Sequence, residues 1–290
     1  MTSDKTAAVL NCGGRFLSLE RPIVMGVLNI TPDSFSDGGR WYRNGRADLS
    51  SLIAHAASMV SAGAEILDVG GESTRPGADP VSQQEELDRV VPVVEALAAE
   101  CEAVISVDSS SPVVMREAAE AGAGLLNDVR ALQREGAVSM AADLDLPVCL
   151  MHMQGSPETM QQSPDYTDVV DEVGRFLLGR VAACEDAGIS RDQILLDPGF
   201  GFGKTLEHNL ELFAGLPRLR ELGFPLLVGL SRKSLIAKIT GREVDERLPG
   251  SLAFGLMAVE RGARLVRVHD VAETADVLKI LAAVQDRESP

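Results

Sequence analysis

Short apolar runs of strand length recur along the chain and alternate with segments of helical periodicity. The apolar runs are continuous rather than alternating, which is typical of strands buried on both faces of a parallel sheet. They cover residues 23–28, 65–69, 103–107, 124–126, 147–151, 194–196, 225–228 and 265–268. Between them, apolar residues recur at helical spacing, which indicates helices with one buried face. One such stripe comprises Leu49, Leu52, Ile53, Ala56 and Val60.

Eight strands that alternate with helices predict a closed (β/α)8 barrel, with an open doubly wound sheet as the alternative. Residues 8–20 predict a short β-hairpin that precedes the barrel. Because no linker, repeat or low-complexity segment interrupts the pattern, we expect residues 1–290 to form one domain. Barrels of this length commonly do so.

Composition narrows the classes of partner. The net charge of −16 argues against nucleic acid and anionic membranes, although a few local cations could still hold a phosphate in a cleft. The four cysteines are far apart and form no CxxC pair, so we expect reduced thiols in a cytoplasmic protein. The sequence also lacks a signal-peptide pattern and an apolar run of membrane-spanning length.

Polar residues stand at the end of nearly every predicted strand. In a barrel, the C-terminal strand ends converge on one face, where binding and catalysis take place. Helix caps and turns would explain single cases, but not acids, amides and imidazoles at the same structural position each time. The residues at these positions are Asn29, Asp68, Asp108, Asn127, Asp128, His152, Asp197, Ser231 and His269.

Residues 197–204 (DPGFGFGK) combine a carboxylate with three glycines, which suits a backbone that turns sharply or approaches a ligand closely. A tight turn with a capping aspartate is the other interpretation. Asp108, Asn127 and Asp197 together offer acceptors and an amide. Such a set could bind a flat heterocycle that carries N–H donors and a carbonyl.

Two cationic groups near the end of the chain could hold an anion. Arg267 and His269 alternate on the last strand and are expected to face the same side, where they could bind phosphate together with Asn29. A surface salt bridge is the alternative. Residues 231–234 (SRKS) open a helix after the seventh strand, and Ser231 could be the N-cap of that helix. Lys233 could reach over the barrel mouth.

Two long polar segments follow the first and second strands. Residues 29–39 place Phe35 near Asp33, and residues 70–78 hold Arg75 in a frame of glycine and proline. Long polar loops on a rigid barrel are usually lids or binding loops, although surface variability would also produce them.

Together these motifs resemble the dihydropteroate synthase family of pterin-binding enzymes. The matching segments are residues 29–39, 68–77, 106–108, 127–128, 150–155, 197–204, 229–234 and 267–270. One departure is the DSSS sequence at 108–111, where the family commonly has DTSK. The resemblance implies that 6-hydroxymethyl-7,8-dihydropterin diphosphate and 4-aminobenzoate condense to 7,8-dihydropteroate and pyrophosphate. It also implies Mg²⁺, inhibition by sulfonamides and a homodimer formed by outer helices, including residues 247–261.

The resemblance further implies roles for single residues. The pterin would contact Asp108, Asn127, Met151, Asp197, Phe202 and Lys233. The diphosphate would contact Asn29, Thr74, Arg75, Arg267 and His269. The aminobenzoate would contact Phe35, Arg75, Pro76, Lys233 and Ser234. Asn29 and Asp33 would hold Mg²⁺, and the catalytic residues would be Asp33, Arg75, Asp197 and Lys233.

Two other functions stay open at this level. One is a pterin-binding barrel that transfers a methyl group from methyltetrahydrofolate to a corrinoid. That chemistry does not call for the loops around Phe35 and Arg75. The other is a non-catalytic relative that binds a pterin or a protein, which would be expected to lose the loop residues that all stand here.

Overall fold

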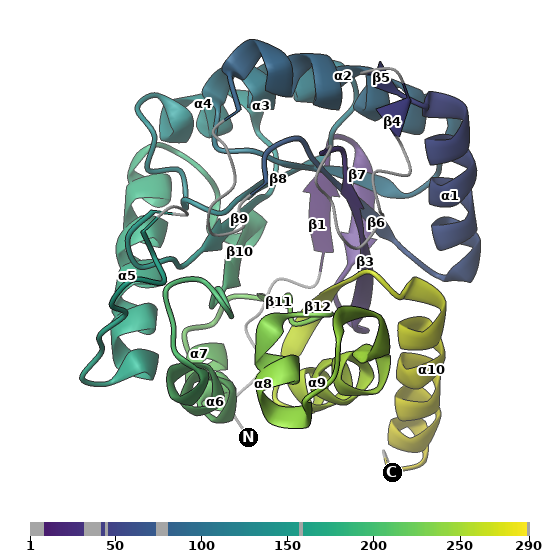
Figure 1. Ribbon diagram of the computed structural model, residues 1–290. Helices are drawn as coiled ribbons and strands as arrows, with labels where there is room; N and C mark the ends of the chain where they lie inside the picture. The colour runs from purple at the N-terminus through teal and green to yellow at the C-terminus, as the bar shows by residue number, and fades with distance from the viewer. Residues whose placement is uncertain (1–8, 32–41, 44–45, 74–80, 157–158, 289–290) are drawn as a thin grey trace.

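Eight parallel strands form a closed barrel with helices on its outside. The computed structural model describes residues 9–31, 42–43, 46–73, 81–156 and 159–288. Figure 1 views the barrel along its axis, and each strand pairs with the next strand of the barrel in the chain until β12 pairs with β3. The barrel strands are β3 (Ile23–Asn29), β6 (Ile66–Gly70), β7 (Val104–Asp108), β8 (Leu125–Asp128), β9 (Val148–Met151), β10 (Ile194–Asp197), β11 (Leu226–Val228) and β12 (Ala263–Val268). This closure confirms the predicted barrel and excludes the open sheet.

Capping residues mark where the first helix begins and ends. The Asp48 side chain accepts a hydrogen bond from the backbone N–H of Ser51 and caps α1, which ends at Gly63 in a left-handed conformation. The helices are α1 (Leu49–Ala62), α2 (Gln83–Glu100), α3 (Pro112–Glu120), α4 (Ala137–Leu144), α5 (Val169–Asp186), α6 (Leu206–Ala214), α7 (Leu216–Arg220), α8 (Ser234–Thr240), α9 (Leu248–Glu260) and α10 (Val271–Glu288). The described residues also form the 3-10 turns η1 (Arg191–Gln193) and η2 (Val244–Glu246).

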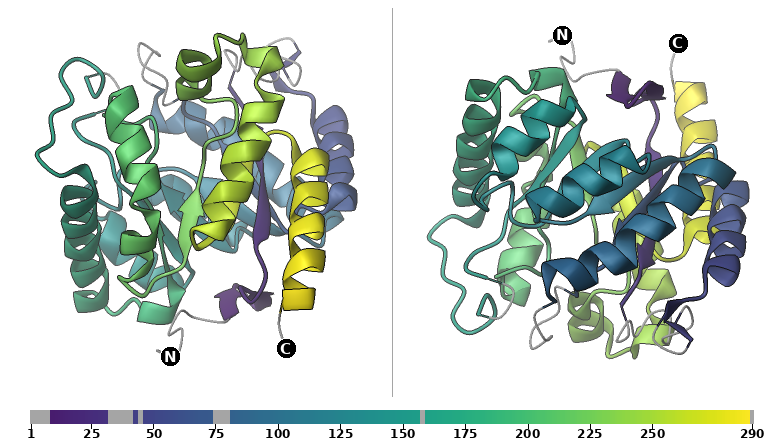
Figure 2. Two further views of the ribbon diagram at one scale, coloured as in Figure 1. Left: turned by 90° about the horizontal axis from the view of Figure 1, so that it is seen from below. Right: turned by 90° about the horizontal axis from the view of Figure 1, so that it is seen from above.

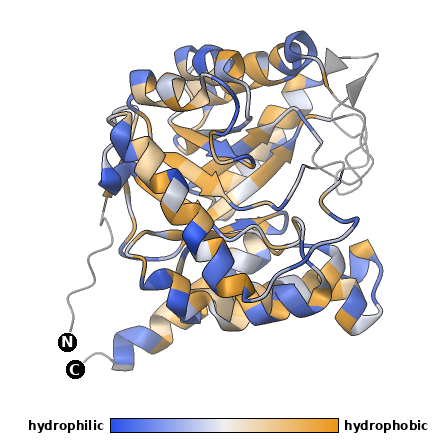
Figure 3. Cartoon of the chain, turned by 90° about the vertical axis from the view of Figure 1, so that its left-hand side faces the viewer, coloured by the Kyte–Doolittle hydropathy of each residue, from blue (hydrophilic) through white to orange (hydrophobic). Residues whose placement is uncertain are grey.

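Two layers of apolar side chains hold this architecture together. One fills the space between the strands and the surrounding helices, and the other fills the barrel interior. In Figure 3 the barrel strands are hydrophobic along most of their length, whereas the outer helices carry both hydrophobic and hydrophilic residues. The strands therefore have no water-facing side, which explains why their sequences do not alternate.

A β-hairpin closes the N-terminal end of the barrel, as the sequence predicts. It consists of β1 (Val9–Cys12) and β2 (Arg15–Ser18), and Figure 2 shows it at the end opposite to α8. Leu10, Cys12 and Leu17 from the hairpin join the interior cluster of the barrel. A second short antiparallel pair joins β4 (Tyr42–Arg43) to β5 (Arg46–Ala47).

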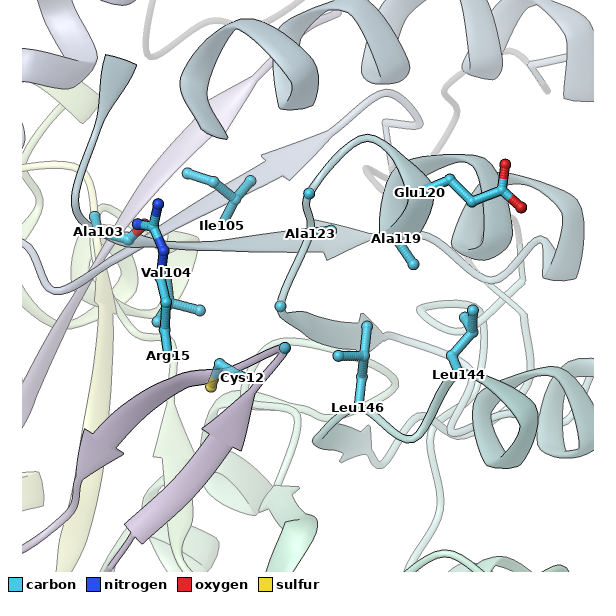
Figure 4. A pocket seen from close by; sticks show the side chains of 13 residues that line it. Cys12, Arg15, Ala103, Val104, Ile105, Ala119, Glu120, Ala123, Leu144 and Leu146 are labelled. Carbon is cyan, nitrogen blue, oxygen red and sulfur yellow. The ribbon is translucent and has the colours of Figure 1, made fainter. Parts of the chain in front are cut away.

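A cavity of about 300 Å³ lies beside this hairpin, between its turn and the first residues of β7 and β8. Small and apolar side chains form most of its wall, with Arg15 and Glu120 among the lining residues (Figure 4). It lies at the N-terminal strand ends, so it is separate from the polar C-terminal ends. Within the described ranges, no helix is long and apolar enough to cross a membrane.

The hairpin offers a test of this arrangement. Leu10 is fully buried and Phe16 on the same hairpin is 74% exposed. We expect Leu10→Ala to lower the free energy of unfolding by about 2–5 kcal/mol, because it leaves a cavity in the barrel interior. Phe16→Ala should change it by less than about 0.5 kcal/mol. Urea denaturation measures both values, and equal losses would show that the hairpin is not part of the core.

Candidate active site

An arginine joins two carboxylates at the C-terminal end of the barrel. Nε of Arg267, on β12, lies 2.6 Å from Oδ2 of Asp68 on β6. Its Nη2 atom lies 3.1 Å from Oδ2 of Asp108 on β7. Asn127, on β8, donates from Nδ2 to the same Asp68 oxygen over 3.1 Å. One network therefore ties four strand ends together, and the surface salt bridge considered for Arg267 is wrong because Asp68 is fully buried.

Two carboxyl groups share one guanidinium group in this network. Burial, followed by the charge of Asp68, raises the pKa of Asp108 to about 8. Burial alone would lower the pKa of Arg267, but the charges of Asp68 and Asp108 outweigh it and raise that pKa. Oδ1 of Asp68 has no hydrogen-bond partner within the described residues, so this buried carboxylate is incompletely compensated.

A second group of residues borders this network. Asp197 ends β10, and its Oδ1 atom accepts a hydrogen bond of 2.7 Å from the backbone N–H of Gly199. Burial raises its pKa. Nζ of Lys233 donates to the backbone carbonyl of Phe200 and lies 4.2 Å from the ring centroid of Phe202. Burial lowers the pKa of Lys233 to about 8, so near neutral pH its amine can lose or keep its proton at little cost.

The two groups form one site. The charges of Asp197, Arg267 and Asp108 all act on the Lys233 amine. Asn127 is joined to the same Arg267 through Asp68. The predicted convergence of these strand ends on one mouth is therefore confirmed.

Glycines in the segment 197–204 allow the close approach that the sequence predicts. Gly199 has φ of +69°, and a Cβ atom there would lie 1.8 Å from the backbone oxygen of His152. Gly201 has φ of +82°, and a Cβ atom there would lie 3.2 Å from Cδ of Lys233. A side chain at Gly199 would thus clash with backbone, and one at Gly201 would displace the lysine.

Other predicted residues lie around the same mouth. Asn29 ends β3, and its side chain lies near that of Asp108 beside Gly70. A Cβ atom placed on Gly70 would lie 3.8 Å from Oδ1 of Asn29 and 3.7 Å from Oδ2 of Asp108. Met151 is buried at the end of β9. Ser234 is exposed and begins α8.

One local prediction is wrong. Ser231 does not cap the following helix, because α8 begins at Ser234 with Lys233 at the N-cap position. The Ser231 hydroxyl instead lies 3.1 Å from Nδ1 of His269 and accepts a hydrogen bond from the His269 backbone N–H. A serine before a helix fits both roles equally well, and only the fold shows that β12 ends beside it.

Five predicted residues lie outside the described residues. They are Asp33, Phe35, Thr74, Arg75 and Pro76. Asn29 is therefore the described member of the expected metal site. Its amide oxygen is a hard, neutral ligand of the type that Mg²⁺ accepts alongside phosphate oxygens and water. The described ranges contain no group of three or more His, Cys, Asp or Glu side chains placed to hold a metal ion.

The structure gives specific partners to three residues that the sequence placed only in a strand-end set or a loop, or did not single out. Asp68 interrupts an apolar run, and a charge in such a run signals a buried partner. Arg130 binds Glu72 through two hydrogen bonds of 3.0 and 2.9 Å, directly before the undescribed segment 74–80. Lys204 is buried below the loop that it ends. No local pattern pairs Arg130 with Glu72, because they are far apart in the chain.

Comparisons with known proteins identify the family. The sequence model of a family described as pterin binding enzyme matches residues 25–269. The dihydropteroate synthase of Escherichia coli K12 is 53% identical over 93% of this chain and 94% of its own length. That of Haemophilus influenzae is 50% identical over 94% of this chain and 98% of its own length.

Solved structures give the same result. The Yersinia pestis dihydropteroate synthase in a sulfonamide complex superposes with a TM-score of 0.92 at 50% identity, covering 96% of this chain and 99% of that one. The Xanthomonas albilineans enzyme with 4-aminobenzoic acid gives 0.89 at 52% identity, covering 97% and 99%. Its complex with 7,8-dihydropteroate gives 0.85 at 49% identity, covering 96% and 98%.

The raised pKa of Asp108 predicts how stability changes with pH. A carboxyl group whose pKa rises on folding stabilises the fold fully below its unfolded pKa, about 4, and loses that contribution as pH rises to about 8. The Asp108→Asn side chain cannot titrate. The melting temperature of this variant minus that of the wild type should therefore increase between pH 4 and pH 8, by on the order of 5 °C at pH 8. Thermal unfolding in phosphate-free buffers measures the difference.

A matched variant is Asp192→Asn, since Asp192 is exposed at the other end of the barrel, before β10. The melting temperature of Asp192→Asn should differ from that of the wild type by the same amount at every pH. A difference between Asp108→Asn and the wild type that does not change with pH would contradict the assigned pKa.

Proposed function

This chain belongs to the pterin-binding enzyme family, and within it to the dihydropteroate synthases. From that premise we infer which residues at the strand ends bind each part of the two substrates. The enzyme condenses 6-hydroxymethyl-7,8-dihydropterin diphosphate with 4-aminobenzoate to give 7,8-dihydropteroate and pyrophosphate. The observation that carries the assignment of residues is that Arg267 binds Asp108 and shares Asp68 with Asn127. The charges of Asp197 and Asp108 act on Lys233 at the same place.

The pterin ring binds in the inner part of the mouth. Its edge presents N–H donors and a carbonyl, which need acceptors and a donor once water is excluded. Asp108, Asp197 and the Asn127 amide supply acceptors, and Lys233 supplies a donor and a positive charge. Met151 and Phe202 provide apolar surface beside the ring. Since several of these groups are buried before the ligand arrives, little ordering is needed on binding.

The chemical step separates charge, and the site is suited to stabilise it. The C–O bond to the diphosphate breaks with its electron pair on oxygen, leaving a methylene cation that the electron-rich pterin delocalises. The aminobenzoate nitrogen then forms the C–N bond and releases a proton. Asp197 stabilises the transient cation, and a fixed carboxylate needs no reorganisation to do so. This division of labour requires no activated nucleophile in the protein.

The diphosphate binds on the side of the mouth formed by the ends of β3 and β12. Arg267 supplies positive charge there, His269 can supply a hydrogen-bond donor, and Asn29 ends the neighbouring strand β3. With Asp68 and Asp108 both ionised, the network around Arg267 would repel an anion. The raised pKa of Asp108 means that a proton can remove this repulsion near neutral pH.

The aminobenzoate binds at the outer part of the mouth, where Lys233 and the exposed Ser234 stand at the start of α8. Phe35, Arg75 and Pro76 complete this subsite in the assignment. The Yersinia pestis relative was solved with a sulfonamide, so we expect sulfonamides to compete with aminobenzoate in this enzyme as well.

Mg²⁺ is the proposed cofactor, with Asn29 and Asp33 as its protein ligands. When bound, it would neutralise charge on the departing pyrophosphate. The amide oxygen of Asn29 lies on the same side of the mouth as Gly70 and Asp108, which is compatible with a metal that takes most of its ligands from phosphate and water.

Two further assignments concern the whole molecule. We place a homodimer contact on the outer faces of α9 and α10, because Ile280 and Val284 on α10 are 67% and 51% exposed. Sedimentation velocity of wild type and Ile280→Lys would test it. A cytoplasmic location is supported by four buried free cysteines and would be tested by cell fractionation.

The residue assignment makes a direct prediction for Asp197. Asp197→Asn keeps the shape but removes the charge, so kcat/KM should fall on the order of 100-fold or more. Asp192→Asn, in the turn η1 just before β10, should leave it unchanged. Pyrophosphate release with both substrates present measures the rate, and equal effects of the two variants would overturn the assignment.

The metal assignment predicts a separate effect. Asn29→Ala should raise the Mg²⁺ concentration needed for half-maximal turnover by on the order of tenfold. Calorimetric titration of pyrophosphate should show binding that Mg²⁺ strengthens in the wild type and strengthens less in the variant. Pyrophosphate binding that is equally strong with Mg²⁺ and with EDTA would exclude a metal at this site.

A further inference from the structure

Lys204 is a buried lysine whose hydrogen-bond partners are all uncharged. Only 2% of the residue is exposed. Its Nζ atom lies 2.8 Å from the backbone oxygen of Gly199, 3.0 Å from that of Phe202 and 2.9 Å from Nδ1 of His152. Burial lowers its pKa well below the usual range. The charge of Asp197 offsets only part of the cost of burying this ammonium group, so the arrangement calls for a specific reason.

The loop before Lys204 is shaped around hydrogen bonds from side chains. Its five successive carbonyl groups all accept hydrogen bonds: Gly199 and Phe202 from Lys204, Phe200 from Lys233, Gly201 from Gln161 and Gly203 from Tyr166. A loop of this kind has few internal hydrogen bonds to fix its shape. The two lysines therefore do much of what a helix or strand ladder would otherwise do.

His152 completes the set of acceptors. Its ring packs edge-on against Phe176 with centroids 5.0 Å apart. Burial, together with the charge of Lys204, lowers its pKa to about 3, so the imidazole is neutral. An ammonium group has three N–H donors and faces three acceptors here, which places the imidazole proton on Nε2. A neutral amine would leave only two N–H donors and would require the proton on Nδ1.

We propose that Lys204 and His152 form a positioning pair, in which the charged amine holds the 197–204 loop in the shape that brings Asp197, Phe202 and Lys233 together. Both members of the pair are buried, with 2% of Lys204 and 5% of His152 exposed. Gly199 and Phe202, whose carbonyls Lys204 holds, also supply the N–H that binds Asp197 and the ring that lies against Lys233. The proposal rests on the proposed function, since it assigns a role in that reaction.

A pair of variants at position 152 separates positioning from general stability. His152→Asn keeps an acceptor where Nδ1 stands, and His152→Leu removes it. Both lose the ring contacts, so their melting temperatures should fall by similar amounts. We expect kcat/KM to fall on the order of 100-fold in His152→Leu and to stay near wild type in His152→Asn. Equal kcat/KM in the two variants would overturn the proposal, and Lys204→Met should resemble His152→Leu.

The pH profile gives a readout that loss of stability alone would not move. The groups that face Lys233 are Asp197 from β10, Asp108 from β7, Arg267 from β12 and the Phe202 ring, with Lys204 behind the loop. If the loop relaxes, water reaches Lys233 and its pKa rises towards its ordinary value. The alkaline limb of kcat/KM should therefore move up by about one pH unit in His152→Leu. An unmoved limb counts against the proposal.

A measurement on the wild type covers the case in which the variants do not fold. Nitrogen-15 NMR of labelled histidine should show His152 protonated at Nε2 and not at Nδ1. Protonation at Nδ1 would mean that Lys204 is neutral, and the proposal would fail. Failure of the proposed function looks different: wild type itself would then release no pyrophosphate with both substrates present.

Discussion

The site depends on a guanidinium group that is shared between two carboxylates across the mouth of a closed barrel. Arg267 reaches from the last strand to Asp68 and Asp108 on two other strands, and Asn127 joins through Asp68. Parallel strands that end together bring these groups within hydrogen-bond distance, although they are far apart in the chain. The same proximity makes the carboxylates repel each other, so the arrangement is costly when empty. A ligand whose N–H groups donate to these carboxylates relieves that cost, and this links binding to the electrostatics of the barrel itself.

Much of the fold follows from the sequence because burial on both faces leaves a clear apolar run for each strand. The predicted runs agree with the observed strands to within two residues, and the hairpin lies where the sequence places it. The strand ends also predicted which residues meet. Sequence could not show that Ser231 binds His269 instead of capping α8, since both are short-range options for a serine. The pairing of Lys204 with His152 was equally inaccessible, because it depends on how two loops cross.

Environment shifts two titrating groups of the site towards each other. Burial raises the pKa of Asp108 and lowers that of Lys233, and both reach about 8. Because the pKa values of this acid and this base both lie near neutral pH, either side chain can gain or lose a proton with a small input of free energy. In a reaction that separates a cation from an anion, such adjustable charge is useful at each stage. Lys204 contributes to this state from outside the pocket, because it holds the loop that keeps water from Lys233.

The glycines of the same loop restrict how the enzyme can evolve. No side chain can be added at Gly199 without a collision with the His152 backbone, and Gly203 is confined in the same way by the backbone oxygen of Gln154, 2.7 Å from a Cβ placed there. Substitution of either glycine by a larger residue is therefore blocked unless the backbone of the neighbouring segment moves.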